Sequence, residues 1–366
     1  MKNPLSNDIY TKRTYFFEED IRGAFFRDQT AIVHSTAFRR LKHKTQVFYA
    51  PKNDHICTRI EHVLHVATIA TTICKGLKAK GWNLDIELAF AIGLGHDLGH
   101  APFGHDGENV LNKLMGGNGA FIHELHSYRV VQYLSNDGKG LNLTYGVKDG
   151  IITHNGEKYE QRLKPVSVPN DLDNIINRQI YPSSFEGCIV RYADKIAYLG
   201  RDVEDAMIAK LITPDDIPAK IRSKIGESNS KIIDFFVNDF ISSSCNSDSV
   251  GFSDNAYELL LELRNFNYRY IYLNDKDLLF PYAEKMLTEL FFFLQNTFES
   301  FSFDFDNYKN SKLQIVKNFG KSISDRKGLY NEQTPSSRIV GDFVAGMTDE
   351  YAIEAFKEIT FPKYII

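Results

Sequence analysis

The segment from residue 94 to residue 108, LGHDLGHAPFGHDGE, limits what this chain can fold into more than any other stretch. It contains three histidines, two aspartates, one glutamate and four glycines in fifteen residues. A helix that only fills a core would use leucine, isoleucine and alanine here, because a buried imidazole without a partner costs free energy. Glycine is unfavourable inside a helix, so Gly93, Gly95 and Gly99 indicate close approach by a ligand or another backbone. We therefore expect a charged group against this segment.

The composition adds limits of its own. The 366 residues, 43% of them hydrophobic, suffice for one large or two ordinary domains. The net charge of −4 gives no global attraction to nucleic acid or anionic membrane, so any polyanion site must be local. The four cysteines form no CxxC pair, which favours free thiols in a reducing compartment. No segment resembles a signal peptide or a membrane span, so we expect a cytoplasmic protein without a membrane partner.

Apolar spacing predicts a mainly α fold. Three-and-four spacing from Ile60 to Leu77 predicts a helix over residues 58–80. Polar composition predicts loops over residues 156–171 and 242–254, and at most a minor hairpin is expected around residues 44–56. Further helices are expected over residues 85–101, 103–115, 121–134, 184–211, 256–272, 277–299 and after residue 335.

Residue types that bind metals recur on separate predicted helices. They are His62, the adjacent pair His96 and Asp97, and Asp194. A metal site needs neutral imidazoles and carboxylates that converge from rigid elements. Two histidines and two aspartates would leave open positions on an octahedral ion such as Mn²⁺, Mg²⁺ or Fe²⁺, as a catalytic site requires.

This order of histidine, HD pair and aspartate resembles the HD-domain phosphohydrolases. Five flanking motifs make the chain similar to the deoxyguanosine triphosphate triphosphohydrolases, the dGTPase-like dNTPases. The resemblance covers about residues 13–355, and five motifs in the right order are strongly specific. The motifs are SxAFRRLxxKTQV (35–47), TRxEHxxHV (58–66), GHDLGHxPFGHxGE (95–108), HExxS (123–127) and AGMTDxYA (345–352).

The resemblance implies hydrolysis of a dNTP, either dGTP or dNTPs generally, to the deoxynucleoside and inorganic triphosphate. It also implies an HD-domain helical fold with extra C-terminal helices. His62, His96, Asp97 and Asp194 would hold one divalent metal ion, Mn²⁺, Mg²⁺ or an ion of the Fe²⁺ or Zn²⁺ type. An additional Mg²⁺ would accompany the nucleotide.

The leaving 5′-oxygen of such a substrate is a poor leaving group, so a general acid is needed. His105 is our candidate, with Glu108 one helical turn later to orient it and keep it protonated. The resemblance places the catalytic histidine at the same position. His100 and His123 are expected to contact phosphate or to support the acid–base chemistry.

The remaining substrate contacts are implied by the resemblance alone. Basic side chains would neutralise the triphosphate, and an amide and a carboxylate would read the 3′-hydroxyl. A tyrosine under the deoxyribose would clash with a 2′-hydroxyl, and a second tyrosine would lie near the base. The basic residues are Arg59, Lys195 and Arg264, and the 3′-hydroxyl would be read by Gln46 and Asp202. Tyr198 would lie under the deoxyribose, and Tyr272 near the base.

Three regions are expected on this basis. Residues 1–57 would form an N-terminal segment with a substrate-binding basic helix, residues 58–211 the HD phosphohydrolase core, and residues 212–366 a C-terminal helical region packed on it.

The resemblance implies a homo-oligomer, commonly a hexamer built from dimers. A second dNTP that acts as an allosteric activator is a further expected partner, since some relatives use one.

Two rival functions stay open. Another HD phosphohydrolase, a 5′-nucleotidase or a phosphodiesterase, would share the HD ligands but not the RRLKHKTQV and GHDGE segments. A nucleotide-binding or single-stranded DNA-binding protein with low turnover is motivated by the basic run over residues 39–44. By itself that run of Arg39, Arg40, Lys42, His43 and Lys44 predicts a solvated helix face.

The other histidines carry weaker expectations. His65 faces an apolar helix and is expected to be a core or supporting residue. His126 stays undecided between a buried hydrogen-bonded residue and a member of the site. The histidines that we expect to belong to no site are His34, His43, His55 and His154.

Overall fold

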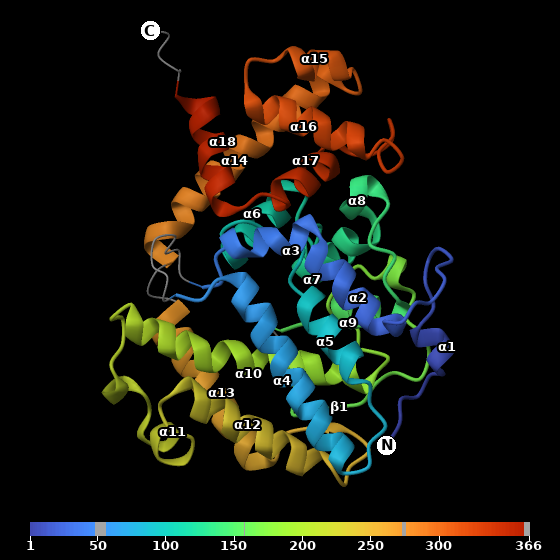
Figure 1. Cartoon of the computed structure of the whole chain (residues 1–366). Helices are drawn as coiled ribbons and strands as arrows, with labels where there is room; N and C mark the ends of the chain where they lie inside the picture. Colours follow the sequence, from blue (N-terminus) through green and yellow to red (C-terminus); the bar gives the residue numbers. More distant parts are fainter. Residues whose placement is uncertain (48–55, 157, 273–275, 362–366) are drawn as a thin grey trace.

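The structure, a computed structural model, describes residues 1–47, 56–156, 158–272 and 276–361. It confirms the mainly α fold. The strands in these ranges are β1 (Arg162–Leu163) and β2 (Val250–Gly251), which pair antiparallel with Arg162 opposite Gly251. Helices form nearly all the other regular structure, and Figure 1 shows them as a lower and an upper group.

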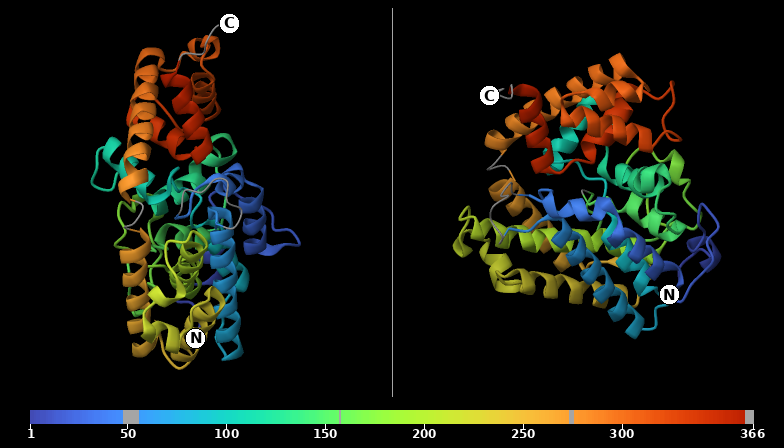
Figure 2. Two further views of the ribbon diagram at one scale, coloured as in Figure 1. Left: turned by 90° about the vertical axis from the view of Figure 1, so that its left-hand side faces the viewer. Right: turned by 45° about the horizontal axis from the view of Figure 1, so that its top comes forward.

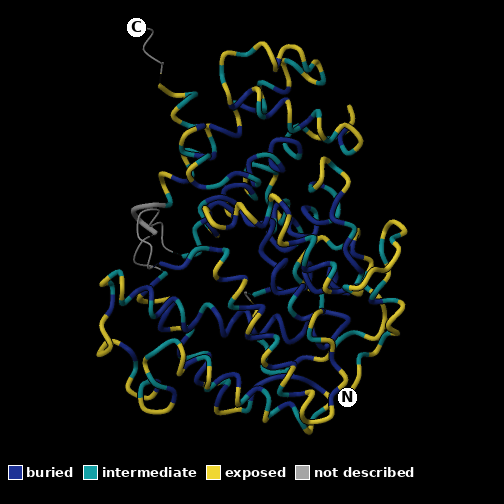
Figure 3. The backbone as a smooth tube through the Cα atoms, viewed as in Figure 1, coloured by how far each residue is buried: buried dark blue, intermediate teal, exposed yellow. Residues whose placement is uncertain are grey.

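Four helices form the centre of the lower group: α4 (Arg59–Ala79), α5 (Ile86–Gly95), α9 (Tyr145–Thr153) and α10 (Phe185–Ile208). Helix α4 begins at a capping box between Thr58 and Glu61, and its predicted extent is confirmed. The expected close approach at Gly93 is also confirmed, because a Cβ atom there would lie 2.6 Å from Cα of Ala67 on α4. Buried residues concentrate where these helices meet (Figure 3).

Shorter elements surround this centre. They are α1 (Asn7–Tyr10), α2 (Gly23–His34), α3 (Thr36–Arg40), η1 (Leu41–His43), α7 (His123–Arg129), the π-helical turn η2 (Val130–Leu134), α8 (Ser135–Gly138), η3 (Leu172–Asn174), η4 (Pro214–Asp216), α11 (Ala219–Lys224), α12 (Asn229–Ser244), α13 (Asp254–Asn267) and the π-helical turn η5 (Tyr268–Tyr272).

The upper group has an apolar core of its own. Leu111 of α6 is buried there with Phe291 and Phe319 from the C-terminal helices. Both views in Figure 2 keep helices α14 to α18 together at one end of the molecule. The boundaries expected at residues 57 and 211 stay a prediction. The helices of this group are α6 (Gly104–Leu114), α14 (Lys276–Phe301), α15 (Phe305–Asn310), α16 (Gln314–Asp325), α17 (Ser336–Ala345) and α18 (Asp349–Thr360).

The structure corrects three local predictions. Residues 242–254 are not a surface loop throughout, because α12 continues to Ser244, β2 follows, and Val250 and Phe252 are fully buried. Residues 156–171 include β1. Lys44 does not belong to a solvated face, because it is buried and its ammonium donates to the carbonyls of His100 and Ala345.

The hairpin expected around residues 44–56 falls largely outside the described residues. What the structure gives of it is a single antiparallel bridge between Thr45 and Thr58. Among the described residues, no helix combines the length and the apolar character needed to cross a bilayer.

Candidate active site

The four predicted metal ligands meet where α4, α5 and α10 converge, and all four are buried. His62 projects from α4, His96 and Asp97 follow the last turn of α5, and Asp194 projects from α10. Nε2 of His62 lies 3.0 Å from Oδ1 of Asp194 and 3.9 Å from Oδ2 of Asp97. Nε2 of His96 lies 3.8 Å and 3.7 Å from Oδ1 of the same two carboxylates.

His96 shows that this group suits a cation. Its Nδ1 donates to the carbonyl of Gly93 at 2.8 Å, so Nε2 carries the free lone pair. That Nε2 atom is buried and has no hydrogen-bond partner within the described ranges of the chain. An orphaned lone pair beside two carboxylates is what a metal ligand requires, and two imidazoles with two carboxylates fit a divalent ion with open positions.

Both carboxylates favour the ionised state that a metal ligand needs. Burial opposes ionisation of Asp97, but the charges of His96 and Arg59 hold the pKa of Asp97 well below its ordinary value. Burial also opposes ionisation of Asp194, and the hydrogen bond from His62 lowers the Asp194 pKa. Nη1 of Arg59 donates to Oδ2 of Asp97 at 2.5 Å, so the guanidinium lies directly beside the metal centre.

A sharp turn leads from this centre into α6. Phe103 and Gly104 both have left-handed backbone conformations, with φ of 63° and 61°, which is costly for a residue with a Cβ atom. Asp349, in the first turn of α18, holds the turn. Its Oδ1 accepts the N–H of Phe103 at 2.9 Å, and its Oδ2 accepts the N–H and hydroxyl of Thr45 at 2.8 Å and 2.5 Å. The C-terminal motif thus braces the segment that presents His105.

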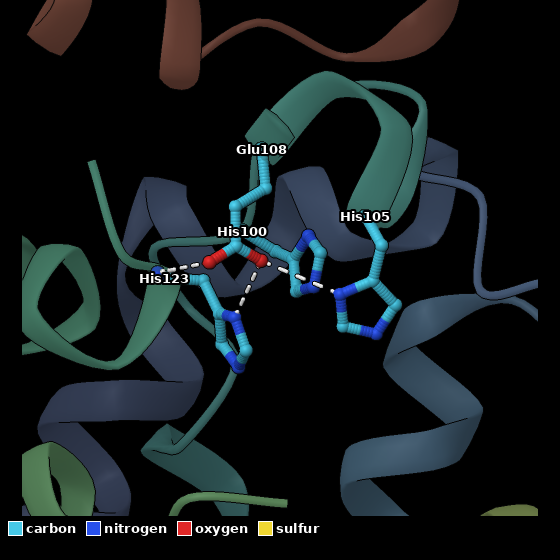
Figure 4. Close-up of side chains that lie close together, drawn as sticks. All are labelled: His100, His105, Glu108 and His123. Carbon is cyan, nitrogen blue, oxygen red and sulfur yellow. Dashed lines mark hydrogen bonds and ion pairs between the residues drawn. The ribbon is translucent and has the colours of Figure 1, made fainter. Parts of the chain in front are cut away.

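The predicted catalytic residues form a second cluster, shown in Figure 4. Oε2 of Glu108 lies 2.8 Å from Nδ1 of His123 and 3.3 Å from Nδ1 of His105. The ring of His100 stacks on that of His123, with centroids 4.5 Å apart. The side chain of His105 is 58% exposed, whereas the other three side chains are buried. The cluster therefore presents one accessible imidazole, that of His105, held against three buried side chains.

The residues of this cluster differ in charge. Burial opposes protonation of His123, but Glu108 and Glu124 together raise the pKa of His123 to about 10. Burial also opposes ionisation of Glu108, but the imidazolium of His123 and the hydrogen bond with His105 hold the pKa of Glu108 well below its ordinary value. Burial and then the charge of Arg59 depress the pKa of His100, which keeps that ring neutral. Atoms of the four residues lie close enough to hold a metal, but the positive charge on His123 disfavours a cation there.

Sequence reasoning missed three members of this site, Arg178, Glu124 and His154. Arg178 donates to Glu108 at 2.8 Å and to Glu124 at 2.8 Å, and so ties the two carboxylates together. His154 was expected to belong to no site, but its buried ring lies 4.9 Å from that of His96 and 5.3 Å from that of His123. Arg178 and His154 lie in no motif with a recognised spacing, whereas Glu124 is part of HExxS.

Tyr159, also missed, brings several predicted substrate residues together. Its hydroxyl is hydrogen-bonded to that of Tyr198 on α10. The guanidinium of Arg264 lies 4.6 Å from the Tyr159 ring centroid, and Nζ of Lys195 lies 5.6 Å from it. Burial and the neighbouring charge of Arg191 lower the pKa of Lys195 to about 7. Two cations and two tyrosines therefore share one region beside Asp194.

The remaining predicted substrate residues are Asp202 on α10, Tyr272 in η5, and Gln46. The hydroxyl of Tyr272 donates to Oδ2 of Asp202 at 2.5 Å, and burial raises the pKa of Asp202 to about 7. Oε1 of Gln46 is buried and has no hydrogen-bond partner among the described residues, and the backbone carbonyl of Gln46 faces Arg59 at 3.4 Å. An unsatisfied amide oxygen and a carboxylate are groups that can bind hydroxyls.

The other histidines lie outside the two clusters. His65 is half-buried on α4, as expected for a supporting residue, and His34 and His43 are exposed. His126 is buried and lies 3.9 Å from Asp342, away from the metal ligands. His55 is outside the described residues.

Comparisons with known proteins agree with this geometry. The model of the HD domain matches residues 59–199, and that of the phosphohydrolase-associated domain matches residues 250–358. The chain is similar to deoxyguanosinetriphosphate triphosphohydrolase-like proteins from several bacteria. Identity is 39% to that of Caldanaerobacter subterraneus, across 94% of this chain and 86% of the relative. It is 37% to that of Desulfatibacillum aliphaticivorans, across 93% and 89%, and 35% to that of Clostridium tetani, across 95% and 89%.

Proposed function

Because the chain belongs to the family of deoxyguanosinetriphosphate triphosphohydrolase-like proteins with an HD domain, we propose that it hydrolyses deoxynucleoside triphosphates. The products would be the deoxynucleoside and inorganic triphosphate. The observation that carries this proposal is the buried His62, His96, Asp97 and Asp194 centre beside a separate histidine cluster with one exposed imidazole. Such a pair offers a cation site next to an acid, which phosphoester cleavage needs.

The metal centre supplies electrophilic assistance. A divalent ion held by the four ligands would act as a Lewis acid towards the phosphoryl group. Arg59 keeps Asp97 ionised through a 2.5 Å hydrogen bond, and it is also proposed to contact phosphate oxygens. Lys195 and Arg264, which flank Tyr159, would neutralise the rest of the triphosphate.

His105 is the proposed general acid. Its imidazole is the accessible member of the histidine cluster, so it can approach the leaving 5′-oxygen, and Glu108 binds its Nδ1 and leaves Nε2 as the proton donor. Glu108 acts through His105 and is a positioning residue. The imidazolium of His123 would hold a phosphate oxygen or support Glu108.

Sugar selection is assigned to α10 and its neighbours. Asp202 and Gln46 would bind the 3′-hydroxyl, and the ring of Tyr198 would occupy the space that a 2′-hydroxyl needs. Tyr272, bonded to Asp202, would lie towards the base.

A product assay tests the proposal. Purified protein is incubated with Mn²⁺ and each dNTP or GTP separately, and the products are separated by chromatography. We expect deoxynucleoside and triphosphate in equal amounts and no turnover of GTP. Stepwise release of orthophosphate would favour a nucleotidase instead. If single dNTPs are inert, dNTP mixtures test for activation by a second nucleotide, and inactivity there would favour a nucleotide-binding or DNA-binding role.

A further inference from the structure

A cavity of about 660 Å³ lies between α3, the segment from α7 to α8, and helices α16 and α17. No residue that we assign to the metal centre, the acid or the substrate lines it. Its inner wall nevertheless adjoins that site. Leu98 follows the ligand Asp97, and the Lys44 ammonium in the cavity wall donates to the carbonyl of His100. In Figure 1 the helices around the cavity belong to both groups, so it lies where the two groups meet.

Four cationic side chains line this cavity: Arg40, Lys44, Lys321 and Arg326. Within the part of the chain that the structure describes, neither arginine forms an ion pair. Nη1 of Arg40 donates to the carbonyl of Gly346 at 2.9 Å, and Nε of Arg326 donates to the carbonyl of Leu134 at 3.0 Å. Both guanidinium groups therefore keep donors that no carboxylate satisfies.

The carboxylates in the wall do not balance these charges. Asp342 is already bound by Arg129, which donates to it at 2.6 Å. Asp137 and Asp325 are exposed, and neither forms an ion pair with another described residue. Apart from Lys44, whose ammonium is bound to two backbone carbonyls, three cations thus face two free carboxylates, which leaves an excess of positive charge in a partly enclosed space.

The cavity also contains an unsatisfied buried group. His126 is 3% exposed, and its Nδ1 has no hydrogen-bond partner in the part of the chain that the structure describes. The nearest carboxylate oxygen, on Asp342, is 3.9 Å away, too far for a hydrogen bond. A buried imidazole nitrogen normally has a partner, so this atom indicates a ligand group that would reach it.

We propose that this cavity binds a compact polyanion, a small molecule with two or more phosphate or carboxylate groups. The guanidinium groups of Arg40 and Arg326, both in the cavity wall, hold the anionic groups by charge-assisted hydrogen bonds. Lys321 adds charge at the entrance, and His126 contacts the innermost part of the ligand. The volume is in the range typical of small-molecule sites.

Isothermal titration calorimetry on the full chain tests this, with pyrophosphate and citrate as separate probes. The pocket variant is R40Q/R326Q. The matched variant is R39Q/K317Q, which removes the same charge from the neighbouring position on α3 and from another exposed position on α16. We expect one binding event to weaken by about tenfold or more in the pocket variant only. Stronger binding of pyrophosphate would assign the site to phosphorylated ligands, and stronger binding of citrate to carboxylates.

Three results would overturn the proposal: no saturable binding of either probe, unchanged binding in R40Q/R326Q, or an equal loss in R39Q/K317Q. The last would mean that net charge alone attracts the probes. If the pocket variant does not fold, Lys321→Gln is compared with Lys317→Gln, since both side chains are exposed on α16 and only Lys321 lines the cavity. Equal affinities of these two variants would then overturn it.

Discussion

The carboxylate of Glu108 lies closer to His123 than to His105, at 2.8 Å against 3.3 Å for the same Oε2 atom. Its Oε1 also accepts the backbone N–H of His123 at 3.1 Å. Glu108 was expected to orient His105 and keep it protonated, and in the structure it also forms a buried ion pair with His123. The exposed imidazole is therefore held by a carboxylate that His123 and Arg178 have already fixed in place.

Replacement of His105 by alanine should slow the chemical step and leave the metal in place. Loss of a general acid typically costs about 10²–10⁴ in kcat. Steady-state kinetics together with metal analysis of the purified variant checks this. His34→Ala, at an exposed position outside the site, is the control. Loss of metal from His105→Ala would mean that His105 is a ligand or supports one.

Replacement of His62 by alanine should instead remove the metal. His62 lies 3.0 Å from Asp194 within the buried ligand group, so metal affinity should fall by more than about a hundredfold, beyond the usual effect of residues that only support ligands. Elemental analysis after dialysis measures the bound metal. His65→Ala, on the same helix, should retain it. Equal metal content in the two variants would contradict the assignment of His62.

These roles were predictable from sequence to different degrees. His62 and Asp194 lie on long helices with clear apolar spacing, and His96 and Asp97 directly follow a predicted helix, so their convergence follows from motif order and helix packing. Tyr159 and Arg178 lie in irregular segments, where no periodicity indicates which way a side chain points. Lys44 looked like part of a solvated face because its charge was visible in the sequence and the two carbonyls that bind it were not.

Asp349 should matter for activity although it lies far along the chain from the site. Asp349→Ala leaves the N–H groups of Phe103 and Thr45 without their acceptor and frees the strained turn before His105. We expect a loss of about 1–3 kcal/mol in the free energy of unfolding for such unsatisfied donors, and a lower kcat. Glu350→Ala, exposed in the same first turn of α18, controls for the charge at the helix terminus. Equal effects of the two changes would show that only this charge matters.

Lys44 should make stability rise with pH in the alkaline range. Burial, and secondly the charge of Arg40, lower the pKa of Lys44 from 10.5 to about 7. Between these values the unfolded chain binds a proton that the folded chain does not. The free energy of unfolding should therefore increase from about pH 7 to about pH 10.5, by an amount on the order of a few kcal/mol, and stay flat below pH 7.

The test compares urea unfolding of the wild type, Lys44→Met and Lys317→Met at several pH values. Because other groups titrate equally in all three proteins, a difference between the slopes of unfolding free energy against pH isolates the contribution of Lys44. Lys317 is exposed, so its variant should keep the wild-type slope, whereas Lys44→Met should lose the rise. Identical slopes in Lys44→Met and the wild type would mean that Lys44 remains charged when buried. Its hydrogen bonds to the carbonyls of His100 and Ala345 would then outweigh the cost of burying the charge.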